Sequence, residues 1–481
     1  MFSLFLSLRK LEPILFLSKI GRSAHGLSTF FCIFALSLHS IQVFGASETS
    51  YSLPRLLKLL EKAPLLTNEV DAMKRMAKGK VQEVEMKRWL TTFEAKAYGG
   101  VVPDGKLTDP RDLNSFRSYD FENDFSFSHL GGFFRTEVEI IQPIWTFGKI
   151  SNYQDAAKMG FTLAEWEQRK RTSEFRYLVK RAFYTLLYST ESITTLKEVE
   201  TRLKDAAEKV EKQLLKDADN VFETDRLKIK VFQADVGNRM IDAVRGQKIS
   251  KAALAEMLDL AGDWVVDQDK LIAEQVEGLE KSQIVSAALR ARPELQQLAT
   301  LISIKESERL AIRGDLFPTI FVAGKINFAV APGREDIKNP FLVDDFNKFD
   351  LGAVLGMKMD LGFYRTINKM DQIRAEIDRM KAQRAQLMAK VKLDAEKSFE
   401  EAVGAVGGIV VNEDGFRAAR SWLTSAGLAF NLGTAETKDV LESFAAFFKA
   451  RADLVRSVFN LNMALSELSD VAGTEVVQRL Q

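Results

Sequence analysis

The sequence has very little of the chemistry that many enzymes use. Its 481 residues include one cysteine and three histidines. The cysteine, Cys32, lies in an apolar run near the N-terminus, and His129 is the one histidine after residue 45. Thiol catalysis, Cys/His zinc sites and Ser-His-Asp triads are therefore excluded for the rest of the chain. Carboxylates are plentiful, but no pair stands in a recognisable acid/base setting.

The sequence also lacks a glycine-rich phosphate loop, a metal-ligand spacing and an excess of one charge. Its formal net charge is +1 with 28% charged residues of mixed sign, so no basic patch points to nucleic acid. We predict a protein that is not an enzyme, holds no cofactor or metal and binds no nucleic acid. No linker rich in proline, glycine or serine divides the chain, so we expect a few very long elements in place of about three ordinary domains.

The first 45 residues are typical of an export signal. Four basic residues precede the apolar run Phe30–Leu38, and small residues lie before Ala46, where a signal peptidase could cut. An N-terminal membrane anchor is the alternative, but the run is shorter than the roughly 20 residues that span a bilayer. No later apolar run approaches that length, so the exported chain would be periplasmic, secreted or a β-barrel of an outer membrane.

The rest of the sequence repeats itself. Four short landmarks recur in the same order at offsets between 211 and 229 residues, which predicts two copies of one unit. One pair is Ala253–Gly262 and Ala464–Gly473, and another is Thr224–Leu227 and Lys438–Leu441. The predicted organisation is a signal peptide (1–45), a first repeat (46–262), an equatorial connector (263–282), a second repeat (283–475) and a C-terminal tail (476–481).

Each repeat is predicted to run helix, strand, strand, long helix, turn, helix. The first helix is expected over Leu53–Met86, and the loops between paired strands over 102–130 and 330–348. Alternation with period two places strands near 90–100, 133–145, 318–329 and 350–360. The helical hairpins are expected to turn near 218–222 and 431–436. In the second turn Gly433 can adopt the positive φ that ends a helix, and Thr434 can cap the next one.

Apolar or small side chains recur every seven residues along the long helices, as in antiparallel coiled coils. In the second repeat they are Met388, Ala395, Ala402, Ile409, Phe416, Leu423 and Phe430. In the first repeat one row contains Ala182, Leu196, Leu203 and Val210, and another contains Val179, Leu186, Ile193, Ala207 and Leu214. Helices of this length need a partner helix to cover the apolar stripe.

Each predicted strand has one largely apolar face and one more polar face. Solvated hairpins packed on a core would explain this pattern, and so would the wall of a membrane barrel in an exported chain. Four strands cannot close a barrel, and open edges are not tolerated in hydrocarbon. If the strands lie in a membrane, several chains must share one barrel, and three copies would supply twelve strands.

Sequence motifs in the two repeats resemble those of the TolC-like outer membrane efflux protein family. Phe430–Leu441 is similar to that family's turn motif, aromatic-x-x-Gly-Thr-x-x-x-x-Asp-Val-Leu, and Gln142–Gly148 to its strand-to-helix junction. The resemblance covers essentially all of Ser52–Glu475. It implies a homotrimer with a twelve-stranded transmembrane β-barrel in the lipid of the outer membrane. A coiled-coil α-barrel would extend from it into the periplasm.

The resemblance also implies partners and sites. The hairpin turns (Asp219, Asn220, Leu432, Gly433 and Thr434) would contact a periplasmic adaptor protein joined to an inner membrane pump. Asp439 and Glu442 match the acids that ring the closed pore. Thr224 and Asp225 match one half of the family's tip gate. Phe430 and Ala435 lack the hydroxyl and the charge of the other half, and Lys438 or Arg226 could supply a substitute cation.

These observations predict the outer membrane channel of a tripartite efflux or type I secretion system. It would be a passive exit duct for small molecules, ions or proteins. The alternative, from a different class, is a periplasmic coiled-coil scaffold or adaptor-like protein without a membrane pore.

Overall fold

The structure is a computed structural model that describes residues 49–89, 92–105, 125–215, 221–268, 270–274, 278, 280–335 and 343–474. The chain divides into two units, Met1–Ser47 and Glu48–Gln481, and the described residues all lie in the second. The predicted signal peptide and C-terminal tail therefore lie outside them, as do residues 218–220 of the predicted first hairpin turn, including Asp219 and Asn220. The division into two sequence repeats stays a prediction.

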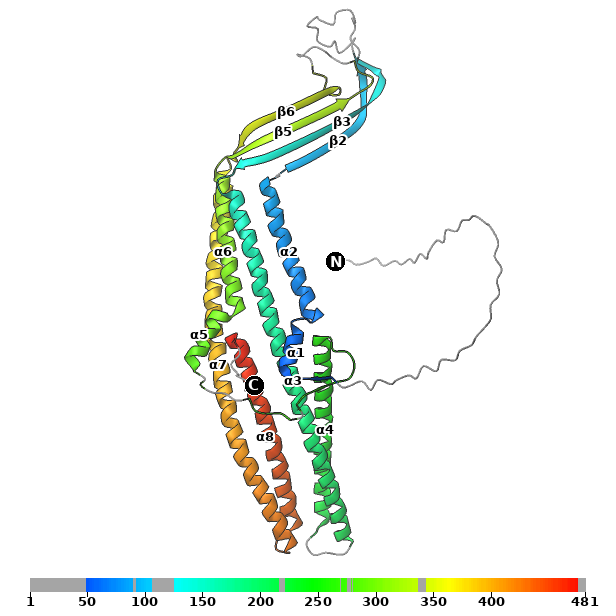
Figure 1. Cartoon of the computed structure of the whole chain (residues 1–481), viewed down its shortest axis with the longest axis vertical. Coiled ribbons are helices and arrows are strands. Elements are labelled where there is room, and N and C mark those ends of the chain that lie inside the picture. The colour runs from blue at the N-terminus through cyan, green and yellow to red at the C-terminus, as the bar shows by residue number, and fades with distance from the viewer. Residues whose placement is uncertain are drawn as a thin grey trace, which may run out of the picture. The chain divides into compact units, whose positions relative to one another are not determined.

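The described unit is mostly helical and contains two sheets (Figure 1). Its elements, in chain order, are β1 (Thr49–Tyr51), α1 (Leu53–Leu60), α2 (Pro64–Trp89), β2 (Thr92–Gly105), β3 (Phe125–Trp145), α3 (Lys149–Leu214), α4 (Glu223–Leu258), β4 (Trp264–Val266), α5 (Lys281–Ala291), α6 (Pro293–Arg313), η1 (Gly314–Leu316), β5 (Thr319–Val330), β6 (Lys348–Lys358), α7 (Phe363–Asn431) and α8 (Thr437–Ala472).

Two very long helices dominate the unit. α3 has 66 residues and α7 has 69, and each is followed by a return helix of 36 residues, α4 or α8. At 1.5 Å per residue, α3 and α7 are each about 100 Å long. Most of the apolar positions predicted on α3 are buried, including Val179, Leu186 and Leu203. The return helices α4 and α8 cover the apolar stripes of the long helices, as the seven-residue spacing predicts.

The helices pack side by side in a fixed order. Near the return turns, α4 packs on α3, α3 on α8 and α8 on α7; nearer the sheet, the order is α2, α3, α6, α7 (Figure 1). α3 and α7 therefore pass through both layers, whereas α4 ends where α2 begins and α8 ends where α6 begins. Leu254, Leu258 and Leu66 meet in one buried cluster at the first of these junctions. Leu468 and Leu295 meet in another at the second.

Apolar contacts and an ion pair join the two helical hairpins. Phe448 of α8 is buried against Val199 and Leu203 of α3. Close by, Arg451 donates a hydrogen bond of 2.7 Å to the Glu198 carboxylate across the same interface. This hydrogen bond holds the pKa of Glu198 below its ordinary value. The α3–α8 interface therefore holds both hairpins together within one chain.

The four strands predicted from alternation form one antiparallel sheet in the order β2-β3-β5-β6. Side chains that lie opposite one another on neighbouring strands form rows across the sheet, and these rows alternate between apolar and polar. Ala95, Val138, Ile326 and Leu351 form an apolar row, and the next row contains Lys96, Glu137, Asn327 and Asp350. Most side chains of β2 and β6 are exposed. The sheet thus presents an apolar face and a polar face.

Three sequence predictions are corrected. The first helix breaks into α1 and α2, because Pro64 has no amide proton to continue the helical hydrogen bonds. The loop expected over 102–130 is shorter, since β2 continues to Gly105 and β3 begins at Phe125. Thr434 does not cap α8: Glu436 is its N-cap, and the Thr434 hydroxyl donates to the Ala429 carbonyl instead.

One sheet was not predicted. β1 and β4 form a two-stranded parallel pair in which Thr49 is opposite Trp264. β4 lies within the predicted equatorial connector, and β1 lies at the start of the predicted first repeat. Tyr51 and Trp264 pack edge to face with ring centroids 6.4 Å apart. The pair ties the start of the described chain to the connector between the hairpins.

Within the described residues, no helix contains a stretch that is both apolar and long enough to cross a membrane.

Candidate functional site at the hairpin tips

The tips of the two helical hairpins lie against each other. Leu441 of α8 is buried with Val210 of α3, Ile229 of α4 and Val221, which immediately precedes α4. At the second tip, Gly433 has a φ of 75°, the left-handed conformation that glycine adopts without strain. The positive φ predicted for Gly433 is therefore confirmed. The first turns of α4 and α8, which contain the predicted site residues Asp225 and Asp439, therefore lie at the same end of the described unit.

Asp225 and Asp439 have the same local role. Each is the third residue of a return helix, and its carboxylate accepts a hydrogen bond from the backbone N–H at the helix start. The distances are 3.1 Å from Phe222 N to Asp225 Oδ2 and 3.3 Å from Glu436 N to Asp439 Oδ2. An acid in the first turn also interacts favourably with the helix dipole. Both aspartates therefore fix the geometry of their turn.

The two aspartates differ in exposure. Asp225 is only 2% exposed and also contacts Lys228 Nζ at 3.5 Å, whereas Asp439 is exposed. Asp439 can therefore present charge to solvent while it holds the helix start, and Asp225 cannot.

Asp225→Ala is expected to destabilise the first tip by about 1–2 kcal/mol, because it removes a cap and leaves the Phe222 N–H without its acceptor. Hydrogen exchange of the amides near Phe222 should become faster by roughly tenfold. Asp235→Ala is the matched control. Asp235 lies on α4 in an exposed pair with Arg239, so its loss should change the exchange very little. Equal exchange in both variants would contradict the capping role.

Glu442, the second predicted pore acid, lies one helical turn beyond Asp439 and is exposed. Lys438 Nζ is 3.9 Å from Glu442 Oε1 on the same helix. Among the described residues, Lys438 is thus paired within its own hairpin, and Asp225 is paired with Lys228 of its own helix. Arg226, the other substitute cation, pairs with Glu223. No ion pair joins Asp225 to Lys438 among the described residues of one chain, and the tip gate stays a prediction.

The tips also carry exposed apolar side chains that the sequence analysis did not single out. Leu432, in the second turn, is 78% exposed, and Val231 of α4 is 70% exposed. Thr224, Leu227, Lys228, Val231 and Phe232 line a shallow groove of about 320 Å³ along α4. Larger contiguous apolar patches mark surfaces that contact other proteins, and the α4 groove is the part of the tips where such side chains lie together. Their spacing on α4 at Leu227 and Val231 is the signal that could have shown them.

No protein-family model matches the sequence, and no curated protein matches it either. Solved structures do match. A membrane protein from Pseudomonas aeruginosa has 13% sequence identity and a TM-score of 0.70, over 89% of this chain and 91% of that chain. The open state of the MtrE outer membrane channel from Neisseria gonorrhoeae has 12% identity and a TM-score of 0.68, over 88% and 89%. The CmeC outer membrane channel from Campylobacter jejuni has 12% identity and a TM-score of 0.66, over 89% and 87%.

Proposed function

We propose that this chain, which has the fold of the TolC-like outer membrane efflux channels, is itself the outer membrane channel of a tripartite export system. It would act as a passive trimeric exit duct. The observation that carries the proposal is the antiparallel sheet with one apolar and one polar face, attached to helices of 66 and 69 residues. An apolar outer face and a polar inner face are what a membrane barrel requires.

The sheet supports a shared barrel. Its edge strands, β2 and β6, would leave backbone N–H and C=O groups unpaired in hydrocarbon unless strands of another chain pair with them. Joining β6 of one copy to β2 of the next closes twelve strands from three copies. Aromatic side chains gather where strands meet helices: Phe147 and Phe317 stack with centroids 5.1 Å apart, beside Trp145. Such aromatic girdles are typical of the membrane interface.

The helices support the same assembly. In the order α4-α3-α8-α7, the outer helices are α4 and α7. Both carry exposed apolar residues: Leu227, Val231, Ile241 and Ile249 on α4, and Leu393, Val406, Val410, Val411 and Trp422 on α7. Packing α7 of one copy on α4 of the next would cover both sets and continue the helical wall into a closed tunnel. That tunnel would extend from the outer membrane into the periplasm.

We also propose the partners and the cargo of the channel. The exposed tips, with Leu432 and the α4 groove, would contact a periplasmic adaptor protein, and an inner membrane pump would supply the energy. Small molecules, ions or proteins could pass through the duct, in tripartite efflux or in type I secretion.

Disulfide cross-linking tests the assembly. Cys32 precedes the proposed cleavage site at Ala46, so introduced cysteines would be the only thiols of the mature chain. Val231 of α4 and Trp422 of α7 lie a similar number of residues from their hairpin turns, on the two outer helices. Oxidation of a Val231→Cys, Trp422→Cys chain is expected to give covalent dimers and trimers in outer membrane fractions, because α3 and α8 separate these helices within one chain.

The matched control is Val231→Cys with Leu461→Cys, since Leu461 is only 3% exposed and cannot reach a neighbouring chain. This pair should stay monomeric on a denaturing gel. A soluble monomer with no cross-link in either variant would favour the periplasmic scaffold and overturn the channel.

A further inference from the structure

A second candidate site lies at the level where α8 ends and α6 begins. We call it the junction pocket. It has a volume of about 890 Å³ and is lined by the start of α2, the middle of α3, the α5–α6 junction and the end of α8. Its charged lining residues are Glu61, Asp71, Lys74, Arg169, Lys170, Glu174, Arg176, Arg290, Arg292, Glu294 and Asp470. Six of these side chains are basic and five are acidic.

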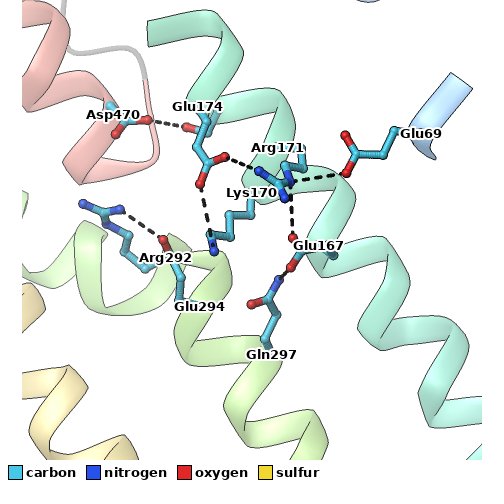
Figure 2. A network of polar contacts seen from close by, with 10 residues as sticks. Glu69, Glu167, Lys170, Arg171, Glu174, Arg292, Glu294, Gln297 and Asp470 are labelled. Atoms are coloured by element: carbon cyan, nitrogen blue, oxygen red, sulfur yellow. Dashed lines mark hydrogen bonds and ion pairs between the residues drawn. The ribbon is translucent and has the colours of Figure 1, made fainter. Parts of the chain in front are cut away.

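A network of ion pairs and hydrogen bonds in the lining of the pocket engages most of its acidic side chains. Arg171 contacts Glu69 at 3.7 Å, Glu167 at 3.5 Å and Glu174 at 3.3 Å (Figure 2). Glu174 also pairs with Lys170, and Glu294 pairs with Arg292 at 3.5 Å. The Ser173 hydroxyl donates to Asp470 at 2.6 Å. Three of the five acidic lining residues are therefore already engaged.

Four cations of the lining remain outside this network. In the part of the chain that the structure describes, Lys74, Arg169, Arg176 and Arg290 form no ion pair, and Arg290 donates a hydrogen bond of 3.4 Å to the Ser286 hydroxyl. The Nε atom of Arg176 is buried without a hydrogen-bond partner, as is that of Arg292. Buried donors without acceptors cost free energy, which an anionic ligand would offset. The two remaining acids, Glu61 and Asp71, are both solvent-exposed and can be screened.

The arrangement of these cations defines the ligand. Arg169 and Arg176 are seven residues apart on α3, so they lie on one helix face about 10 Å apart along the axis. The Arg169 guanidinium lies 4.4 Å from the Trp166 ring centroid, which orients it over an aromatic surface. Lys74 approaches from α2. Guanidinium groups bind carboxylate and phosphate in a bidentate manner.

We propose that the junction pocket binds a small molecule with two or more anionic groups, phosphate or carboxylate, held by Arg169, Arg176 and Lys74. The site is separate from the hairpin tips and does not depend on the channel function. Its volume falls in the range of small-molecule pockets.

Calorimetric titration of the detergent-solubilised full chain tests the proposal with two probes, tripolyphosphate and tetraglutamate. The parent should bind at least one, and the tighter probe identifies the anionic group. Arg169→Gln with Arg176→Gln should weaken binding at least tenfold, and Lys74→Gln alone should weaken it severalfold. The control, Arg239→Gln with Arg245→Gln, removes the same charge from exposed positions of α4 and should change the affinity less than twofold.

Either of two results would overturn the proposal: no heat with either probe in the parent, or equal weakening in the pocket and control variants. The second result would mean that net charge alone attracts the anion. Arg171 is unchanged in all variants, so the network that holds α2, α3 and α6 together is preserved. If the double variant fails to fold, the single Lys74→Gln change on α2 decides the question.

Discussion

A channel with Asp439→Asn and Glu442→Gln in every copy is expected to bind a blocking multivalent cation at least tenfold more weakly than the parent. In a trimer these two positions would place six carboxylates around one axis, where their fields add in a narrow pore. Single-channel current in a planar bilayer should rise, and block by hexaamminecobalt(III) should need a higher concentration. Asparagine is chosen at 439 because its side-chain oxygen can still accept the N–H of Glu436.

The control for this experiment is Asp235→Asn with Asp242→Asn, which removes the same charge from exposed positions of α4. Its block should equal that of the parent. Unchanged block in the tip variant would remove Asp439 and Glu442 from the pore constriction. Asp439→Ala would be a poorer test, because losing the cap could open the tip for a reason unrelated to charge.

Phe183→Ala is expected to lower the stability of the folded chain by about 3–5 kcal/mol. Phe183 lies on α3 with no exposed surface, in the cluster where α1, α3 and the end of α4 meet. Its removal would leave a cavity among side chains such as Leu56 and Leu254, which are also fully buried. Guanidinium-induced loss of helical circular dichroism in detergent should therefore occur at a markedly lower concentration.

Phe222→Ala is the matched control, since Phe222 is 56% exposed and its side chain makes no capping hydrogen bond. Its denaturation midpoint should stay close to that of the parent. A similar midpoint for both alanine variants would show that the junction of α1, α3 and α4 is not a main source of stability.

The sequence predicted the long elements well because their signals are long. Seven-residue spacing over dozens of residues identifies α3 and α7, and period-two alternation identifies the four strands. Strand ends were less predictable. Gly99, Gly100 and Pro103 indicate a loop in isolation, yet they lie in β2 because the ladder with β3 continues through them. Pairing with a neighbouring strand overrides the local preference.

The place of the predicted site residues in the fold could be predicted from the sequence, but their contacts could not. The turn motif places Asp439 and Glu442 at the second tip, where the structure has them. The capping role of Asp439 has a local signal, an acid three residues after the helix start, but the burial of Asp225 depends on packing against the rest of the first tip. The Lys438 partner could not be chosen from sequence, because Glu442 at four residues and Asp225 on another hairpin are equally plausible acceptors.

The end-to-end junctions of α4 with α2 and of α8 with α6 have a mechanical consequence. Among the described helices, α3 and α7 alone run unbroken from the hairpin tips to the sheet, so a twisting force at the tips would be transmitted toward the strands by these two helices of each chain. The other two helical lines, α4 with α2 and α8 with α6, each contain a junction packed by buried side chains. Gly473 sits at one of these junctions, where an added Cβ would come 2.6 Å from the Cβ of Ala291. Tight apposition at that junction limits how far its two halves can shear.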